Sequence, residues 1–241
     1  MTDISDIRKF YDDFSPRLQR DRQVSNKRHE HIKAHLMSVI KPGMRVLDIG
    51  CGTGVTTDYI AGLVGESGLV TGVDLSDANI IYARKRNERE NAEFLCADIC
   101  KFNPEQGLLP DFDSSIERTA SGFKYDAIIA ADVIEHIPAK RLLAFIKNIA
   151  ALSHDDTIIY INVPYAPFTS YMWEHHPEAM QIEDRIIRIE GIASLFSMIG
   201  FTPIWSNIYG IDAPYQYLSM IFVTAKKINQ YYSRNIPVNP K

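Results

Sequence analysis

The chain has 241 residues, a length that favours one α/β domain with a modest accessory element over two independent domains. Hydrophobic residues make up 46% and charged residues 23% of it, as in soluble globular proteins, and no run approaches the roughly 18 apolar residues of a membrane span. The net charge of -4 disfavours proteins that coat nucleic acid, because phosphate binding normally needs a basic surface. Three cysteines without paired Cys-x-x-Cys spacing disfavour disulfides and a thiolate zinc site. No signal-like pattern opens the chain, so we expect a cytoplasmic protein.

Basic residues are concentrated at the N-terminal end. Residues 1–45 carry ten Lys or Arg and six Asp or Glu, whereas acidic residues are in excess over the rest of the chain. Charge runs usually form a solvated helix face. The alternative is a cap that covers an anionic substrate, and the sequence leaves both interpretations open.

From residue 26 onward the hydrophobic pattern predicts helices and strands in alternation. The expected helices lie near residues 26–40, 55–63, 77–90, 138–151 and 189–199, and the expected strands cover residues 45–49, 69–74, 92–98, 125–131 and 157–163. This alternation implies a Rossmann-like, doubly wound α/β fold with a mostly parallel sheet and helices on both faces. Two more strands, 202–209 and 216–225, are joined by so short a connection that they must pair antiparallel, which gives a seven-stranded sheet.

The same reading divides the chain into segments. We expect an N-terminal helical lid or cap over residues 1–43, a main domain over residues 44–228, and a polar tail over residues 229–241. The polar stretch 103–122 predicts a surface insertion. Residues 164–188, rich in aromatic side chains and histidines, predict a second insertion on the substrate side, although an interface or core-covering loop is an equal alternative.

Gly50, Gly52 and Gly54 lie between a predicted strand and a predicted helix. Such a loop lets backbone amides approach a ligand closely and aims the helix N-terminus at it. A dinucleotide-binding dehydrogenase is the first rival, but its pattern would place Gly or Ala where Val55 stands. Asp74 ends the second strand, where a carboxylate normally holds the hydroxyl pair of an adenosine. The loop and this carboxylate together predict an adenosine-containing cofactor.

Four stretches in this order and spacing resemble successive motifs of class I S-adenosylmethionine-dependent methyltransferases. They are Val46–Gly54, Val73–Ser76, Cys96–Ile99 and Ala131–His136, and the resemblance covers residues 44 to about 165. The sheet of this family also ends in an antiparallel strand pair. The resemblance implies S-adenosylmethionine as the cofactor.

By this resemblance, amides around Gly50 and Gly52 meet the methionine part of the cofactor, Asp74 takes the ribose hydroxyls, and Asp98 with Ile99 holds the adenine. The residues expected at the cofactor are Tyr11, Asp48, Gly50, Cys51, Gly52, Gly54, Asp74, Leu75, Asp98, Ile99 and Ala131. Two alternatives stay open, because Asp48 could merely orient the loop and Asp98 could cap the next element.

Tyr11 lies in Phe10–Phe14, a stretch that resembles the short Tyr-Asp segment with which many small-molecule methyltransferases close over the cofactor. The segment 1–25 is therefore expected to act as a mobile lid. Tyr11 could equally be a surface-packing aromatic residue.

The segment Asp132–Pro138 resembles the stretch after the fourth strand in small-molecule O-methyltransferases, including those of ubiquinone biosynthesis and of sugars or glycans. It predicts methyl transfer to a hydroxyl of a small-molecule or glycan-type acceptor. An RNA-modifying 2′-O-methyltransferase and a cofactor-binding protein without turnover remain as alternatives. DNA base methylation is disfavoured, because the Asn/Asp-Pro-Pro-aromatic sequence is missing there. The oligomeric state stays open.

Asp132, Glu135 and His136 stand at i, i+3 and i+4, which would put them on one face if a helix begins directly after the fourth strand. With Glu in place of Asp132, the arrangement resembles the metal-binding stretch of small-RNA 3′-end 2′-O-methyltransferases, which use a further downstream histidine. His175 or His176 could supply it, and the set Asp132, Glu135, His136 and His176 would suit Mg²⁺ or Mn²⁺. The alternative is that His136 acts as a general base without metal, or only packs.

Overall fold

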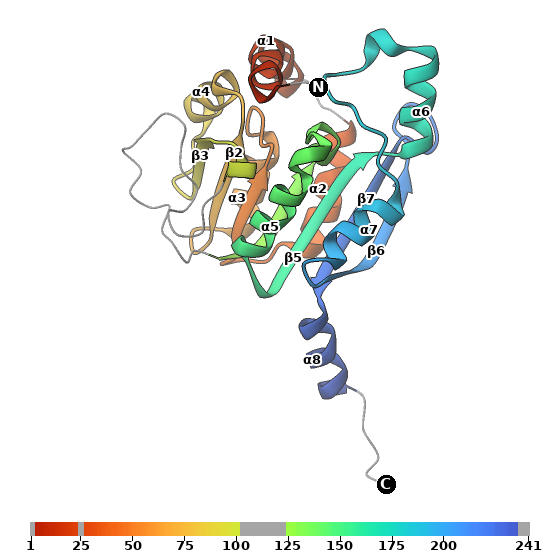
Figure 1. The fold of residues 1–241 in the computed structure, drawn as a ribbon. Helices are drawn as coiled ribbons and strands as arrows, with labels where there is room; N and C mark the ends of the chain where they lie inside the picture. The colour runs from red at the N-terminus through yellow and green to blue at the C-terminus, as the bar shows by residue number, and fades with distance from the viewer. Residues whose placement is uncertain (1–2, 24–26, 102–123, 236–241) are drawn as a thin grey trace.

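The computed structural model describes residues 3–23, 27–101 and 124–235 (Figure 1). Its centre is a seven-stranded sheet with the order β3-β2-β1-β4-β5-β7-β6. The strands are β1 (Arg45–Ile49), β2 (Leu69–Asp74), β3 (Ala92–Cys96), β4 (Tyr125–Ala131), β5 (Ser153–Pro164), β6 (Phe201–Tyr209) and β7 (Tyr217–Thr224). The first five strands pair parallel, and β7 pairs antiparallel with both β5 and β6. The predicted doubly wound, mostly parallel sheet with an antiparallel C-terminal pair is confirmed.

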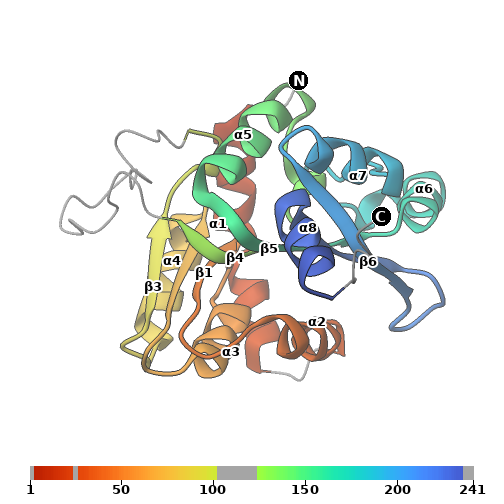
Figure 2. The same cartoon turned by 90° about the horizontal axis from the view of Figure 1, so that it is seen from below.

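Helices cover both faces of the sheet, and Figure 2 shows α2 and α3 on one face and α5 and α7 on the other. The α-helices are α1 (Ile4–Gln23), α2 (Lys27–Val39), α3 (Val55–Val64), α4 (Asp77–Arg86), α5 (Leu142–Leu152), α6 (Ala166–His175), α7 (Ile189–Ser197) and α8 (Ala225–Asn235). The 3₁₀ turns are η1 (Ile99–Lys101), η2 (Ile134–His136), η3 (Ala139–Arg141) and η4 (Pro177–Ala179). None of the helices described is both long and apolar enough to cross a membrane.

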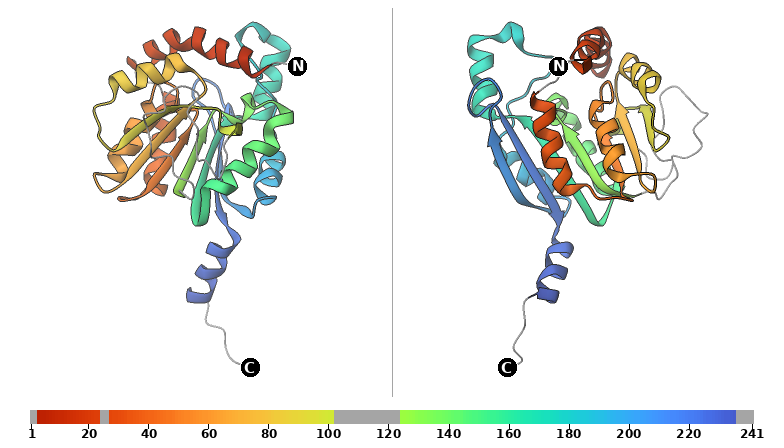
Figure 3. Two further views of the ribbon diagram at one scale, coloured as in Figure 1. Left: turned by 60° about the vertical axis from the view of Figure 1, so that its left-hand side comes forward. Right: turned by 180° about the vertical axis from the view of Figure 1, so that it is seen from behind.

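The core has two apolar layers because neighbouring strand residues point to opposite faces. Within β4, Ile128 belongs to the layer that holds residues of α5 and α7, whereas Ile129 belongs to the layer that holds residues of α2, α3 and α4. Leu36 of α2 is fully buried in the second layer. The predicted cap of residues 1–43 is therefore not uniform, since α2 belongs to the core and only α1 lies over the end of the sheet (Figure 3).

The chain order reverses between β1 and β4, which are neighbours in the sheet although two strands separate them in sequence. Ligands of open α/β sheets bind at the carboxyl ends of the strands at such a point. Figure 3 shows α1 lying across this end, while α8 projects from the opposite end. The fold thus brings the loops after β1 and β4 together beneath α1.

Two further predicted segments, the insertion and the polar tail, reach beyond the described residues. The predicted insertion 103–122 lies outside the described residues. Helix α8 extends to Asn235, so the first part of the predicted polar tail continues a helix.

Candidate active site

A cavity of about 220 Å³ lies at the carboxyl ends of β1, β2 and β4, and we call it the front cavity. Apolar side chains of α1, among them Ile7 and Phe14, form part of its wall. All residues predicted at the cofactor line it except Gly54, and the predicted residues that do so are Tyr11, Asp48, Gly50, Cys51, Gly52, Asp74, Leu75, Asp98, Ile99 and Ala131. The sequence motifs therefore converge on one cavity.

The loop after β1 requires glycine at Gly50. Its φ of 69° lies in the left-handed region, and a Cβ there would stand 2.3 Å from the Cγ2 of Val133. The Gly50 amide donates to the Val73 carbonyl at 2.7 Å, and the Gly52 amide donates to Asp74 at 2.8 Å. Both amides thus have partners within the protein, and their predicted contact with the methionine part of a cofactor stays a prediction.

Gly54 has a different position from the other loop glycines. It is the N-cap of α3 with a φ of 82°, and a Cβ on it would lie 2.8 Å from the ring of Phe94. It therefore lets α3 pack closely on β3 behind the front cavity, and it is not part of the cavity wall.

Asp74, at the end of β2, is held by the loops on both sides. One carboxylate oxygen accepts from the Gly52 amide at 2.8 Å, and the other accepts from the Ser76 amide at 2.8 Å and from the Asn79 side chain at 3.4 Å. Burial raises the pKa of Asp74, against these hydrogen bonds, which lower it. An ionised carboxylate oxygen can accept more than one hydrogen bond. The carboxylate of Asp74, which lines the front cavity in a fixed position, can therefore still accept hydrogen bonds from a ligand there.

Asp48 accepts a hydrogen bond of 2.6 Å from the Thr57 hydroxyl of α3 and is 2% exposed. Burial raises the pKa of Asp48 to about 7, while the Thr57 hydrogen bond lowers it. This bond ties the end of β1 to α3, which supports the interpretation that Asp48 orients the loop.

Asp98 lines the front cavity after β3, but both of its oxygens already have partners. One accepts from the Cys100 amide at 3.0 Å, and the other pairs with the guanidinium of Arg141. Asn148 of α5 donates to the Ile99 carbonyl at 2.7 Å. These contacts fix the part of the cavity wall at which adenine binding is predicted. Arg141 belongs to this wall but was not predicted from the sequence.

Helix α1 is fastened at two points. The carboxylate of Asp12 accepts from the Ser76 hydroxyl at 2.6 Å and from the Ala78 amide at 3.2 Å, at the N-terminal end of α4. The hydroxyl of Tyr11 donates to the Gln181 side chain at 3.2 Å. Residues from α1 and from the segment 164–188, which we call the excursion after β5, therefore meet over the front cavity.

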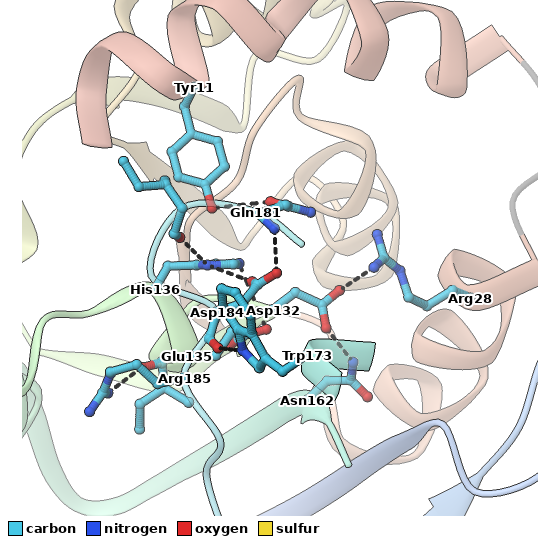
Figure 4. A network of polar contacts seen from close by, with 12 residues as sticks. Tyr11, Arg28, Asp132, Glu135, His136, Asn162, Trp173, Gln181, Asp184 and Arg185 are labelled. Atoms are coloured by element: carbon cyan, nitrogen blue, oxygen red, sulfur yellow. Dashed lines mark hydrogen bonds and ion pairs between the residues drawn. The ribbon is translucent and has the colours of Figure 1, made fainter. Parts of the chain in front are cut away.

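The backbone after β4 differs from the sequence prediction. Asp132 has a φ of 56°, and the short 3₁₀ turn η2 follows, so no helix begins directly after β4 and the condition for a shared helix face of Asp132, Glu135 and His136 is not met. A residue other than glycine with positive φ is uncommon and is found where surrounding contacts enforce it. Here the Asp132 carboxylate pairs with Arg28 at 3.0 Å and accepts from Asn162 of β5 at 2.9 Å. Figure 4 shows these contacts.

The imidazole of His136 lies between the front cavity and the excursion after β5 (Figure 4). Its Nδ1 is 3.2 Å from the Ile182 carbonyl and 3.2 Å from the Asp184 carboxylate. Both neighbours are acceptors, so Nδ1 carries the proton and Nε2 keeps its lone pair. Burial lowers the pKa of His136, while Asp184 raises it. The orientation of the neutral imidazole is thereby fixed, with Nε2 able to accept a proton.

A second cavity of about 160 Å³ lies behind His136, and we call it the rear chamber. It shares Arg28, Asp132, His136 and Gln181 with the front cavity. Glu135 lines it, is 2% exposed, and has a carboxyl whose two oxygens make no hydrogen bond to the described residues. Burial raises the pKa of Glu135 well above its ordinary value.

His175 and His176, the two candidates for the further downstream histidine, are exposed at the end of α6. His175 stacks on Tyr171, and the Nδ1 of His176 lies 3.6 Å from Glu178. Within residues 3–23, 27–101 and 124–235 there is no group of three or more His, Cys, Asp or Glu side chains arranged to hold a metal ion. The guanidinium of Arg28 beside Asp132 also disfavours a cation there, so the predicted metal set does not fit the geometry.

Several residues of this site were not predicted from the sequence. They are Arg28, Arg141, Asn162, Gln181, Asp184 and Arg185. Gln181 and Asp184 lie in the segment 164–188, which was predicted as a substrate-side insertion. That prediction was based on the aromatic side chains and histidines of the segment, so it did not single out Gln181 or Asp184. Arg28 lies in the basic N-terminal segment, where one of several basic residues could not be singled out.

The chain matches a known protein family over most of its length. A family model described as a methyltransferase domain matches residues 17–215. The chain belongs to this methyltransferase-domain family. The prediction of a class I S-adenosylmethionine-dependent methyltransferase is confirmed at the level of family and fold.

Individual relatives are more distant. A ubiquinone biosynthesis O-methyltransferase of Glaesserella parasuis is 29% identical over 130 residues, which are 54% of this chain and 49% of that protein. A probable cobalt-precorrin-6B C(15)-methyltransferase of Thermoplasma acidophilum is 38% identical over 71 residues, 28% of this chain and 35% of that protein. This methyltransferase domain spans at most about half the length of these curated relatives.

Among solved structures, the fold is similar to magnesium protoporphyrin IX methyltransferase from Synechocystis PCC 6803 with bound SAH. The TM-score is 0.69 at 17% identity, over 92% of this chain and 100% of that one. At this identity the likeness shows the fold alone.

Proposed function

We propose that this methyltransferase domain transfers the methyl group of S-adenosylmethionine to a hydroxyl of a small-molecule or glycan-type acceptor, with His136 as the general base. The observation that carries the proposal is the position of His136, whose imidazole lines both cavities. A base at this junction can reach an acceptor hydroxyl beside a methyl donor in the front cavity.

The front cavity suits this cofactor. The carboxylate of Asp74 is fixed where two neighbouring ribose hydroxyls can donate to it. Asp98 with its Arg141 partner fits the adenine end of the cavity. Acidic side chains in this wall also favour a positively charged ligand over a phosphate-bearing one such as a dinucleotide.

S-adenosylmethionine supplies an electrophilic methyl group on a sulfonium, and the thioether that leaves needs no proton. The chain must therefore align the acceptor oxygen with the methyl carbon, exclude water and accept the hydroxyl proton. In this proposal His136 Nε2 takes that proton as the new O–C bond forms and the S–C bond breaks. The Asp184 carboxylate, 3.2 Å from Nδ1, stabilises the resulting imidazolium.

The test is methyl transfer from labelled S-adenosylmethionine into fractionated cell extract. Label in small polar metabolites or glycans supports the proposal. Label confined to RNA would favour the RNA-modifying alternative, and cofactor binding without transfer into any fraction would favour a protein without turnover.

The pH dependence should report the state of His136, because only the neutral imidazole accepts a proton. Burial lowers the pKa of His136 from its ordinary value of about 6.5. We therefore expect kcat/KM to rise with pH along an acidic limb whose midpoint lies below about 6.5. Above that limb His136 is fully neutral, and its titration no longer changes kcat/KM. The measurement is a pH–rate profile of the wild-type protein. A limb with its midpoint above pH 7, about half a unit beyond the ordinary value, would contradict this assignment.

Helix α1 is proposed to act as a lid held by Asp12. Asp12→Ala removes the acceptor for the Ser76 hydroxyl and the Ala78 amide. We expect cofactor affinity to fall about ten- to hundredfold, the worth of one hydrogen bond to a charged group, with little change in thermal stability. Asp13→Ala is the matched control, because the neighbouring Asp13 forms an exposed surface pair with Lys9 in the described part of the chain. Equal affinities of the two variants, measured by calorimetry, would remove the lid role.

A further inference from the structure

The rear chamber is lined by residues of α6 and η4, which we call the α6–η4 excursion, and by His136. Because it shares Asp132, His136 and Gln181 with the front cavity, a molecule in it lies next to the base. The inference below rests on the methyl transfer proposed above and concerns what occupies this chamber.

The size and walls of the rear chamber limit its occupant. Its volume of about 160 Å³ is close to the roughly 150 Å³ of an engineered cavity that binds benzene. Phe168 and Met172 of α6, with Pro164 and Met180, line it with apolar surface. These walls fit one six-membered ring, and methionine side chains adapt well to a flat face.

The two arginines that line the chamber, Arg28 and Arg185, are balanced in number by two aspartates, Asp132 and Asp184. Arg28 lies 3.0 Å from Asp132, and the imidazole of His136 lies 3.2 Å from Asp184. A charged ligand would lose its hydration without meeting a net countercharge here. The chamber therefore favours an uncharged molecule.

Two polar groups at the chamber lack a partner among the described residues. They are the carboxyl of Glu135, which is 2% exposed, and the buried Nε of Arg185 (Figure 4). A buried polar group without a hydrogen bond is costly, so a ligand that satisfies it gains affinity. A hydroxyl suits both groups, since it can donate to the carboxyl and accept from the guanidinium. Glu135 Oε1 is 3.9 Å from His136 Nε2, so such a hydroxyl lies beside the base.

We propose that the rear chamber is the acceptor site and that the acceptor presents an uncharged, hydroxylated six-membered ring, anchored by the carboxyl of Glu135 and the Nε of Arg185. The α6–η4 excursion acts as the specificity-determining wall. The hydroxyl that reaches His136 is the one methylated.

The experiment uses phenol as the probe and S-adenosylhomocysteine as a cofactor product that prevents turnover. Thr169 of α6 is 3% exposed and lines the chamber, so Thr169→Met fills it. Ser170→Met is the matched control, because Ser170 is exposed and its hydroxyl, like that of Thr169, bonds the carbonyl four residues earlier. Binding of phenol is measured by ligand-observed NMR, with benzoate as a charged probe of similar size.

In the wild type and in Ser170→Met we expect phenol to bind and benzoate to bind more weakly. In Thr169→Met, phenol binding should fall about tenfold or more while S-adenosylhomocysteine affinity stays unchanged, which also shows that the variant is folded. Equal phenol binding by the two variants, no phenol binding by the cofactor-bound wild type, or tighter binding of benzoate would each overturn the inference. Failure of S-adenosylhomocysteine to bind the wild type would instead count against the proposed function.

Discussion

His136→Ala should lower kcat by about 10²–10⁴-fold while the affinity for S-adenosylmethionine stays nearly constant. The side chain is oriented by Asp184 and the Ile182 carbonyl and is proposed to act only on the acceptor proton. A base that is needed in the transition state affects kcat more than the binding of the cofactor. The measurement combines methyl transfer kinetics with calorimetric titration of the cofactor.

His175→Ala is the control, because His175 is an exposed histidine stacked on Tyr171. It should retain the wild-type rate. Asp184→Asn should also lower kcat, since a neutral amide does not stabilise the imidazolium that forms on His136. Full activity of His136→Ala, with and without EDTA, would leave alignment of the two substrates as the whole mechanism.

Asp74→Ala should weaken S-adenosylmethionine binding by on the order of 1–3 kcal/mol, because charged hydrogen bonds to the ribose would be lost. Asp74 also accepts from the amides of Gly52 and Ser76, so the variant loosens the loop that shapes the front cavity. Calorimetry gives the affinity, and thermal unfolding shows how much of the effect is structural.

Asp77→Ala serves as the matched control, because Asp77 is an exposed carboxylate on the first turn of α4, three residues away. It should leave the affinity unchanged. Unaltered binding in Asp74→Ala, or tighter binding of NAD than of S-adenosylmethionine by the wild type, would contradict the assignment of the front cavity.

The sequence by itself determined the elements of the sheet and the loop of the front cavity. Strand β4 was predicted with the observed bounds, and the last two strands were predicted as an antiparallel pair. These features depend on alternating apolar residues and on neighbours within a few positions along the chain. The glycine loop that contains Gly50 and the place of Asp74 at the end of β2 are likewise local, which is why they could be predicted.

The tertiary structure alone decided the environment of His136. Its partner at the Ile182 carbonyl is 46 residues away, and the contact of Tyr11 with Gln181 joins residues 170 apart. Asp132 illustrates the reason, because its i, i+4 spacing to His136 would give a shared helix face only if a helix began directly after β4. Contacts of its carboxylate with α2 and β5 enforce a positive φ instead. A local pattern specifies local backbone only where distant contacts do not override it, and around this site they do.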